Sequence, residues 1–168
     1  MIDTLELRQA LGQFATGVTI VTTLDADERP IGVTASSFNA VSLSPPLILW
    51  SLGKNAFSHP AFEAASHFCV HVLSGAQREL SDRFARASSA KFEGLALARG
   101  LGGSPMLQGC AATFECATEH RYDGGDHLIL VGRVLRLATS PVRDPLLFYQ
   151  GRYAEIAQAC SEAQTAAA

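Results

Sequence analysis

The chain has 168 residues and lacks any excess of positive charge: 13 Lys and Arg residues stand against 16 Asp and Glu residues, and the net charge is −3. Proteins that bind nucleic acids neutralise phosphates with a basic face, so this composition argues against that class. No apolar run approaches the roughly 20 residues that a helix needs to cross a bilayer. The first residues, MIDTLELRQALGQF, form an amphipathic helical pattern without the layout of a signal peptide. We therefore expect a cytoplasmic protein that binds neither nucleic acid nor membrane.

Several catalytic and metal-binding motifs are also missing. The four cysteines, Cys69, Cys110, Cys116 and Cys160, form no C-x-x-C pair, and no histidine stands at metal-ligand spacing. This pattern favours buried, reduced thiols, and no metal site is predicted. A Ser-His-Asp hydrolase would be expected to carry a G-x-S-x-G elbow, which is absent. The segment GLGGS at residues 100–104 neither follows a strand pattern nor opens a helix, so it is not a dinucleotide-binding fingerprint.

What the chain does contain is a succession of strand patterns with few helices between them. Hydrophobic residues make up 48% and charged residues 17%, which is typical of one globular domain. Extended segments are predicted at residues 18–25, 31–52 (two runs), 68–74, 110–122, 127–139 and 146–156, and helices at 4–15, 60–67 and 76–88. A doubly wound parallel sheet needs a helix between successive strands. The pattern instead predicts a mainly β antiparallel barrel or sandwich with peripheral α-helices.

The domain is expected to span residues 1–156. Within it, residues 90–109 are punctuated by glycine and predict a long surface excursion rather than a linker between domains. The remaining residues, 157–168, form an alanine-rich tail that is expected to be a frayed helix or disordered.

A first candidate site combines two polar clusters about twenty residues apart. Thr34, Ser36 and Ser37 offer hydroxyls and backbone N–H groups beside the small Ala35. A second cluster at the end of a predicted strand contains Ser51, Gly53, Lys54 and Asn55. Two adjacent antiparallel strands would place both clusters around one anion, such as a phosphate. Turn chemistry at strand ends is the alternative explanation, and spacing alone favours it.

A second candidate site is the junction at which the polar loop YDGGD meets the apolar run LILVGRV. Gly124 and Gly125 allow positive φ or close approach of a ligand, and His127 offers an imidazole next to Asp126. The residues alone favour a half-buried strand histidine held by Asp126 or by a carbonyl. The aromatic residues are mostly expected in the core, with a few in polar loops where they would wall a planar ligand.

Six segments carry a resemblance when they are taken together and in order. They are FATGVTIVTT, GVTASSFNAVSLSPPLILWSL, FCVHVLS, SPMLQGCAATFEC, GGDHLILVGRV and PLLFYQGRY. With this order and spacing, the chain resembles the flavin reductase family of FMN-binding split-barrel proteins, the reductase components of two-component flavin monooxygenases. The resemblance implies a Greek-key split β-barrel and a homodimer with the flavin near the subunit interface. It also implies reduction of FMN or FAD by NADH or NADPH, and a separate monooxygenase that receives the reduced flavin.

By position, the resemblance also implies roles for single residues. The flavin ring edge and phosphate would be held by Thr34, Ala35, Ser36, Ser37, Ser51, Lys54 and Asn55, and the cofactor would be flanked by Phe57 and Phe84. The nicotinamide would lie beside Gly125, Asp126 and His127, with Tyr153 approaching the same pocket. The phosphate contacts depart from the family pattern, because relatives often carry a further serine within Lys54-Asn55-Ala56.

The implied chemistry fits the residues present. Hydride transfer from a nicotinamide to a flavin needs the two rings stacked and water excluded, and the cofactors supply the electronics. The expected catalytic residues are therefore positioning groups: His127 positions the nicotinamide, and Asp126 orients the imidazole. No arginine cluster indicates a 2′-phosphate site, which favours NADH over NADPH. Two alternatives are a flavin-binding electron-transfer module without NAD(P)H turnover, and an oxidase of the pyridoxamine-phosphate-oxidase type, for which the chain is poor in basic residues.

Overall fold

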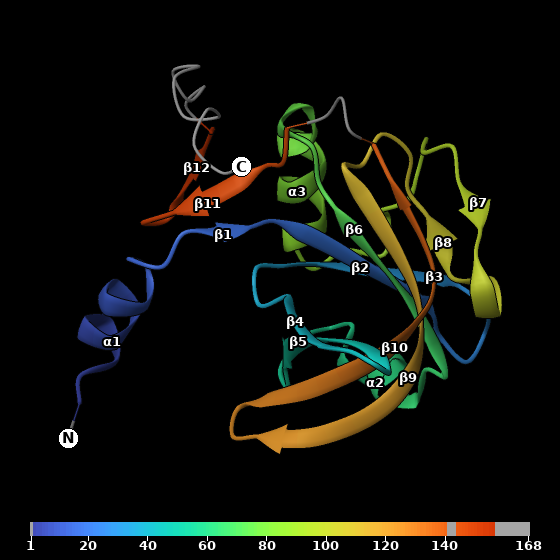
Figure 1. The fold of residues 1–168 in the computed structure, drawn as a ribbon, viewed down its shortest axis with the longest axis horizontal. Helices are drawn as coiled ribbons and strands as arrows, with labels where there is room; N and C mark the ends of the chain where they lie inside the picture. The colour runs from blue at the N-terminus through green and yellow to red at the C-terminus, as the bar shows by residue number, and fades with distance from the viewer. Residues whose placement is uncertain (1, 141–143, 157–168) are drawn as a thin grey trace, which may run out of the picture.

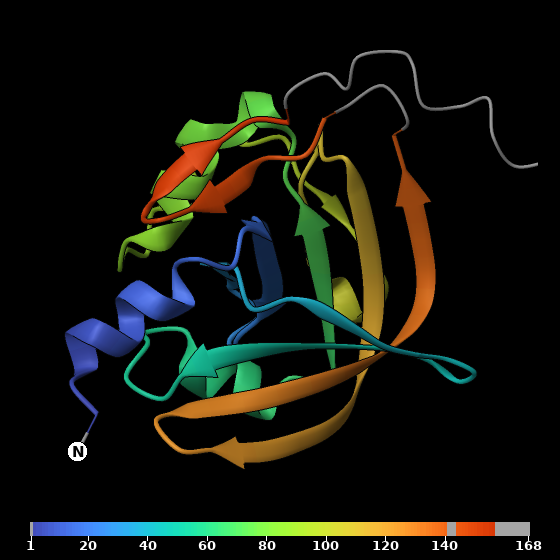
Figure 2. The same cartoon turned by 60° about the vertical axis from the view of Figure 1, so that its left-hand side comes forward.

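The computed structural model describes residues 2–140 and 144–156, and its architecture is a strongly curved antiparallel sheet with helices at its periphery (Figures 1 and 2). The main sheet has seven strands. In spatial order they are β3 (Pro30–Ala35), β2 (Thr19–Leu24), β6 (His67–Val72), β9 (Ala112–Gly124), β10 (His127–Thr139), β5 (Pro46–Gly53) and β4 (Asn39–Leu43).

Every neighbouring pair in this sheet is antiparallel. The strands β3 and β4 are its two edges, so the barrel is not closed by hydrogen bonds. The connections from β3 to β4 and from β5 to β6 cross between the two halves of the sheet, as in a Greek key. The predicted mainly β, antiparallel split barrel is confirmed in this architecture.

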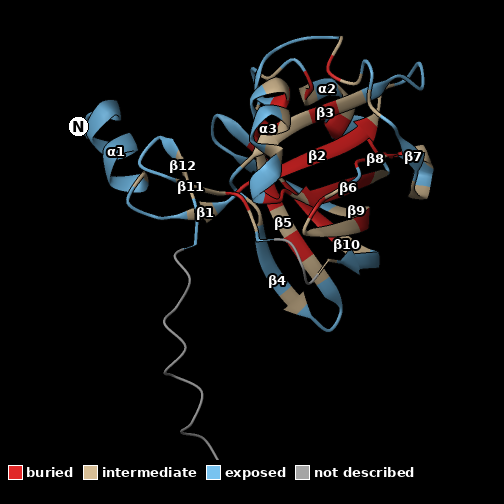
Figure 3. Ribbon diagram, turned by 90° about the horizontal axis from the view of Figure 1, so that it is seen from above, coloured by how far each residue is buried: buried red, intermediate tan, exposed pale blue. Residues whose placement is uncertain are grey.

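The sheet buries side chains on both faces, which explains the apolar character of its central strands. One core contains Trp50, Phe62, Phe68 and Leu130, and the two aromatic rings of Trp50 and Phe62 meet edge to face at 4.8 Å. A second core lies on the other side and includes Ile20, Leu73 and Phe84. Strand β2 contributes to both cores and β6 to the first, and both strands are buried along most of their length (Figure 3).

The helices and shorter strands lie around this sheet. The helices are α1 (Thr4–Leu11), α2 (His59–Ala64) and α3 (Arg78–Ala85), with short 3-10 turns η1 (Gly75–Gln77) and η2 (Leu101–Gly103). A small sheet contains β1 (Thr16–Gly17), β11 (Leu147–Tyr149) and β12 (Arg152–Ala154), and a two-stranded ladder contains β7 (Ala98–Arg99) and β8 (Pro105–Met106). None of the helices in the described ranges has the length and hydropathy needed to cross a membrane.

Two details refine the sequence predictions. The helix predicted over residues 4–15 starts as expected, where the Asp3 carboxylate accepts from the N–H groups of Leu5 and Glu6, but it ends at Leu11 and is followed by Gly12. The glycine-rich segment at 100–104 contains the 3-10 turn η2; it follows the short strand β7, which the sequence pattern did not predict, and it opens no α-helix. The predicted tail, 157–168, lies outside the described residues.

The cysteine thiols of the barrel are buried. Cys69 and Cys116 form no disulfide, and burial raises the pKa of the Cys116 thiol to about 12 and that of Cys69 higher still. These two thiols match the expected buried, reduced state, whereas Cys160 lies outside the described residues.

Candidate functional site

The site is built around the hairpin that joins β9 to β10. Gly124 pairs with His127 at the end of the ladder, which leaves Gly125 and Asp126 as the two turn residues. Gly125 has a φ of +79°, a left-handed conformation that a side chain disfavours. The turn therefore fixes where His127 enters the sheet.

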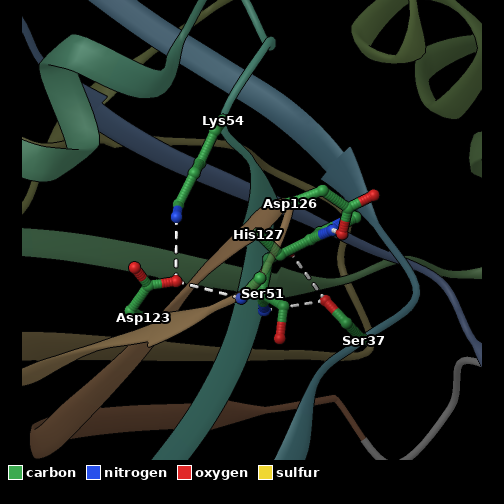
Figure 4. A network of polar contacts seen from close by, with 7 residues as sticks. Ser37, Ser51, Lys54, Asp123, Asp126 and His127 are labelled. Carbon is green, nitrogen blue, oxygen red and sulfur yellow. Dashed lines mark hydrogen bonds and ion pairs between the residues drawn. The ribbon is translucent and has the colours of Figure 1, made fainter.

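His127 is held by its neighbour. Its Nδ1 donates to the Asp126 carboxylate at 2.7 Å (Figure 4), and this contact lowers the pKa of Asp126 below its usual value. With the Nδ1 proton committed, Nε2 is left as the acceptor of the neutral ring. The ring lies across from Gly53, where a Cβ would come within 3.8 Å of Nε2. About half of the His127 side chain is exposed, so Nε2 is available to a ligand.

A second interaction ties the same hairpin to the loop after β5. The Lys54 ammonium donates to the Asp123 carboxylate at 2.8 Å, and the same oxygen accepts from the N–H of Gly125 at 3.0 Å (Figure 4). The backbone N–H of Lys54 donates to the carbonyl of Asp126 at 2.9 Å. The bond to Lys54 is the main cause that lowers the pKa of Asp123. The turn that carries His127 is thus held from both the side chain and the backbone of Lys54.

The two polar clusters predicted from the sequence meet at a single pair of residues. The Ser37 hydroxyl donates to the carbonyl of Ser51 at 3.0 Å and accepts from the N–H of Ser51 at 2.9 Å (Figure 4). The link after β3 is therefore fastened to β5, although β3 and β5 are not hydrogen-bonded neighbours in the sheet. The clusters come together as predicted, but through this link rather than through adjacent strands.

Known proteins with similar sequences indicate the family to which the chain belongs. Residues 11–157 match the model of the flavin reductase like domain. The chain belongs to the flavin reductase family. It is 49% identical to the FMN reductase (NADH) SmoA of Agrobacterium fabrum over 146 residues. The matched segment covers 87% of this chain and 82% of SmoA. It is 43% identical to the reductase subunit HsaB of a flavin-dependent monooxygenase of Rhodococcus jostii, over 92% of this chain and 79% of that one.

Solved structures agree with the sequence relatives. The NADH:FAD oxidoreductase SgcE6 of Streptomyces globisporus, in complex with NAD and FAD fragments, superimposes with a TM-score of 0.88 at 39% identity, over 94% of this chain and 95% of that one. The predictions of the family, the split-barrel fold and a flavin reductase activity that uses a flavin and NADH are confirmed by these relatives. The assignment of single residues to the ligands stays a prediction.

In this flavin reductase, several predicted flavin-binding side chains are already committed within the protein. Thr34 on β3 donates its hydroxyl to the carbonyl of Ser81 on α3 at 2.7 Å, and both polar functions of the Ser37 hydroxyl are used by Ser51. What this segment offers a ligand is chiefly its backbone, because β3 is an edge strand and its outer N–H and C=O groups carry no ladder. Ser36 and Asn55 are exposed and have no side-chain hydrogen bond among the described residues.

The two aromatic residues that were predicted to flank the flavin, Phe57 and Phe84, differ in their exposure. Phe57 lies in the loop between β5 and α2 and is 64% exposed, so its ring is free to contact a ligand. Phe84 has no exposed surface: it packs in the second core, with its ring edge to face against Phe92 at 4.9 Å. The structure does not bring Phe84 to the site as the sequence suggested, because α3 turns this position inward against β3.

Tyr153 also lies apart from His127 within one chain. It sits on β12, at the end of the molecule opposite the β9–β10 turn (Figures 1 and 2). Its hydroxyl donates to the Asp82 carboxylate at 2.6 Å and lies 2.9 Å from the Ser81 hydroxyl. Burial is the first cause that raises the pKa of Tyr153, and the bond to Asp82 adds to it. Through Ser81, Tyr153 is linked to Thr34 and so to the β3 side of the site.

One residue of the site was missed by sequence reasoning. Asp123 stands in the quoted loop YDGGD, yet nothing in the linear pattern indicates that its carboxylate reaches Lys54, 69 positions away. The sequence signal for Asp123 was the turn itself. An aspartate that stands two residues before a glycine in a turn commonly accepts a hydrogen bond from the backbone N–H of that glycine.

Proposed function

We propose that this protein is the flavin reductase component of a two-component oxygenase: it takes a hydride from NADH, passes it to FMN or FAD, and supplies the reduced flavin to a separate monooxygenase. The observation that carries the proposal is the His127–Asp126 pair at the start of β10, clamped by Lys54 and Asp123 in a chain of this family. The relatives named as an NADH-dependent FMN reductase and as a monooxygenase reductase subunit support both halves of the reaction.

The residues present fit a flavin. An open edge strand lets the main chain of residues 34–37 pair with the polar edge of a planar ring, and small side chains there permit close approach. The exposed Phe57 ring offers an apolar surface nearby. When bound, the flavin supplies a ring that accepts a hydride.

The protein's own groups position the ligands rather than transfer protons. The Nδ1–H bond to Asp126 fixes the His127 ring, so Nε2 is presented to a carboxamide N–H of the nicotinamide. The Ser37–Ser51 bonds and the Lys54–Asp123 pair hold the elements that carry these groups, which keeps the two ligands in register.

The test is His127→Ala, assayed by NADH oxidation with FMN and, separately, by quenching of flavin fluorescence. Loss of the positioning group should raise the apparent KM for NADH or lower kcat, while flavin affinity stays within a few-fold. His120→Ala is a matched control, because His120 is an exposed histidine on β9 that makes no hydrogen bond to the site. Collapse of flavin binding with unchanged nicotinamide parameters would contradict the assigned role.

We also infer that the working unit is a homodimer. Helix α1 buries none of its residues and projects from the body of the molecule (Figures 1 and 3). Its apolar side chains and those just beyond it are exposed: Ile2, Leu5, Leu7, Leu11 and Phe14. Exposed large apolar side chains concentrated on one element indicate an association site. A second copy of this chain is the occupant that the family resemblance favours.

Sedimentation equilibrium of the full chain tests the dimer. The wild type should have twice the chain mass at micromolar concentration, and Leu11→Glu with Phe14→Glu should shift it toward the monomer. Replacement of exposed Tyr122, which lies on β9 away from α1, is the control. A monomeric wild type would contradict the inference.

The cytoplasm, where NADH is supplied, is the proposed location.

A further inference from the structure

Tyr153 on β12 carries a hydroxyl that is committed to helix α3. The phenolic O–H donates to the Asp82 carboxylate at 2.6 Å, and the same oxygen lies 2.9 Å from the hydroxyl of Ser81. A phenol has a single proton, so with that proton on Asp82 the Ser81 hydroxyl donates to the Tyr153 oxygen. Ser81 is fully buried, and its hydroxyl has no other hydrogen-bond partner in the part of the chain that the structure describes. Tyr153 therefore satisfies a buried polar group of α3.

The ring of Tyr153 is held by contacts that do not involve its hydroxyl. The Arg78 guanidinium lies over the ring, 5.0 Å from its centroid, and Phe148 on β11 meets the ring edge to face at 5.6 Å. Both contacts depend on the ring alone. The substitution Tyr153→Phe therefore removes the hydroxyl and leaves the packing of β12 in place.

Ser81 makes a second bond, to strand β3. Its carbonyl accepts a hydrogen bond from the Thr34 hydroxyl at 2.7 Å. Thr34 pairs with Ile20, a residue of the second core, and the side chains of cross-strand partners lie on the same face of a sheet. The Thr34 side chain thus points toward α3. One residue of α3 joins Tyr153, through its hydroxyl, to Thr34, through its carbonyl.

Helix α3 packs so closely against β3 that a movement of the helix is passed to the strand. A Cβ on Gly32 would lie 2.5 Å from the Phe84 ring, so no space separates the two elements there. The Lys91 ammonium also ties them, because it donates to the carbonyls of Gly32 and Phe84, each at 2.9 Å. In the main sheet β3 pairs with β2 alone, so its contacts with α3 help to fix where its open edge lies.

Resting on the proposed function, we propose that Tyr153 is a positioning residue for the flavin ring: through Ser81 and Thr34 it holds the edge of β3 that receives the ring. The sequence expectation placed Tyr153 beside the nicotinamide. The hydrogen bonds point instead to the flavin, because Tyr153 lies at the end of the chain opposite His127 (Figure 1), whereas two bonds through α3 connect it to Thr34.

Equilibrium binding of FMN and riboflavin, followed by quenching of flavin fluorescence, tests the proposal together with NADH oxidation at saturating FMN. Tyr153→Phe should weaken the binding of both flavins by about 3- to 10-fold, the range for the loss of one hydrogen bond, because the displaced segment holds the ring that both share. The KM for NADH should stay within about two-fold of the wild type, as for a change away from the ligand. Tyr149→Phe is the matched control: Tyr149 lies in the same small sheet, but its hydroxyl donates to Gln13 at 3.4 Å, so its loss should not change flavin affinity.

A double-mutant cycle separates this role from a general loss of packing. Ser81→Ala removes the hydroxyl and keeps the carbonyl that holds Thr34, so it should weaken flavin binding about as much as Tyr153→Phe. The double variant should bind flavin no more weakly than either single variant, because all of them remove the same bond.

Additive losses in the double variant, or a raised KM for NADH with unchanged flavin affinity in Tyr153→Phe, would each overturn the proposal. A wild type that binds flavin without oxidising NADH would reject the proposed function alone. An active reductase whose flavin affinity is insensitive to Tyr153→Phe would reject this inference alone.

Discussion

Acidification should weaken the barrel through one buried histidine. The His71 side chain on β6 is fully buried; its Nδ1 donates to the carbonyl of Ile20 at 3.1 Å, and its Nε2 accepts from the N–H of Leu107 at 3.0 Å. Only the neutral ring makes both bonds, because protonation of Nε2 removes the acceptor that the Leu107 N–H needs. Burial lowers the pKa of His71 to about 4, from an ordinary value of 6.5.

The sign and size of the effect follow from this pKa. Because the folded pKa is below the unfolded one, the unfolded chain binds the extra proton first, so stability is full above pH 6.5 and is lost as the pH falls toward 4. The whole shift corresponds to about 3 kcal/mol, of which about 2 kcal/mol is lost by pH 5. The lowered pKa values of Asp25, Asp123 and Asp126 add losses near and below their ordinary value of 3.8, and that of Glu119 adds a loss near and below 4.5. Between pH 7.5 and 5, the loss of stability should therefore come mainly from His71.

Urea unfolding at fixed protein concentration, at pH 7.5, 6.5, 5.5 and 5.0, measures this loss. The stability of the His71→Gln protein should vary much less with pH, because the substitution removes the buried group that titrates. His120→Gln, at an exposed histidine, should retain the wild-type pH dependence. A pH dependence that is the same in the wild type and in His71→Gln would refute the reasoning.

Three further predictions concern single positions. Gly125→Ala should cost about 1–2 kcal/mol by forcing a side chain into a φ of +79°, and it should raise the KM for NADH; urea unfolding and steady-state kinetics measure the two effects. Asp123→Asn should lower kcat/KM for NADH by loosening the turn, while the melting temperature barely moves, because its pair with Lys54 is solvent-exposed. Gly32→Ala should destabilise the fold by about 1–3 kcal/mol in urea unfolding, because its Cβ would lie 2.5 Å from the buried Phe84 ring.

The strands could be predicted from sequence because their patterns are local. The β-branched run at residues 18–25 and the apolar run at 127–139 became β2 (Thr19–Leu24) and β10 (His127–Thr139) nearly unchanged. The end of α1 was less predictable, because Phe14 continues the apolar spacing beyond the point at which the helix stops. Strand order was also beyond the pattern: the contact between Ser37 and Ser51 depends on a link that crosses the sheet.

Site residues were predictable where neighbours in sequence act together and less so where distant segments meet. Asp126 and His127 are adjacent, so their hydrogen bond was foreseeable. Phe84 was misplaced because an aromatic residue in a helix has the same pattern whether it faces the core or a ligand. The burial of Lys91 beside β3 was not predictable either, since a lysine is normally solvated.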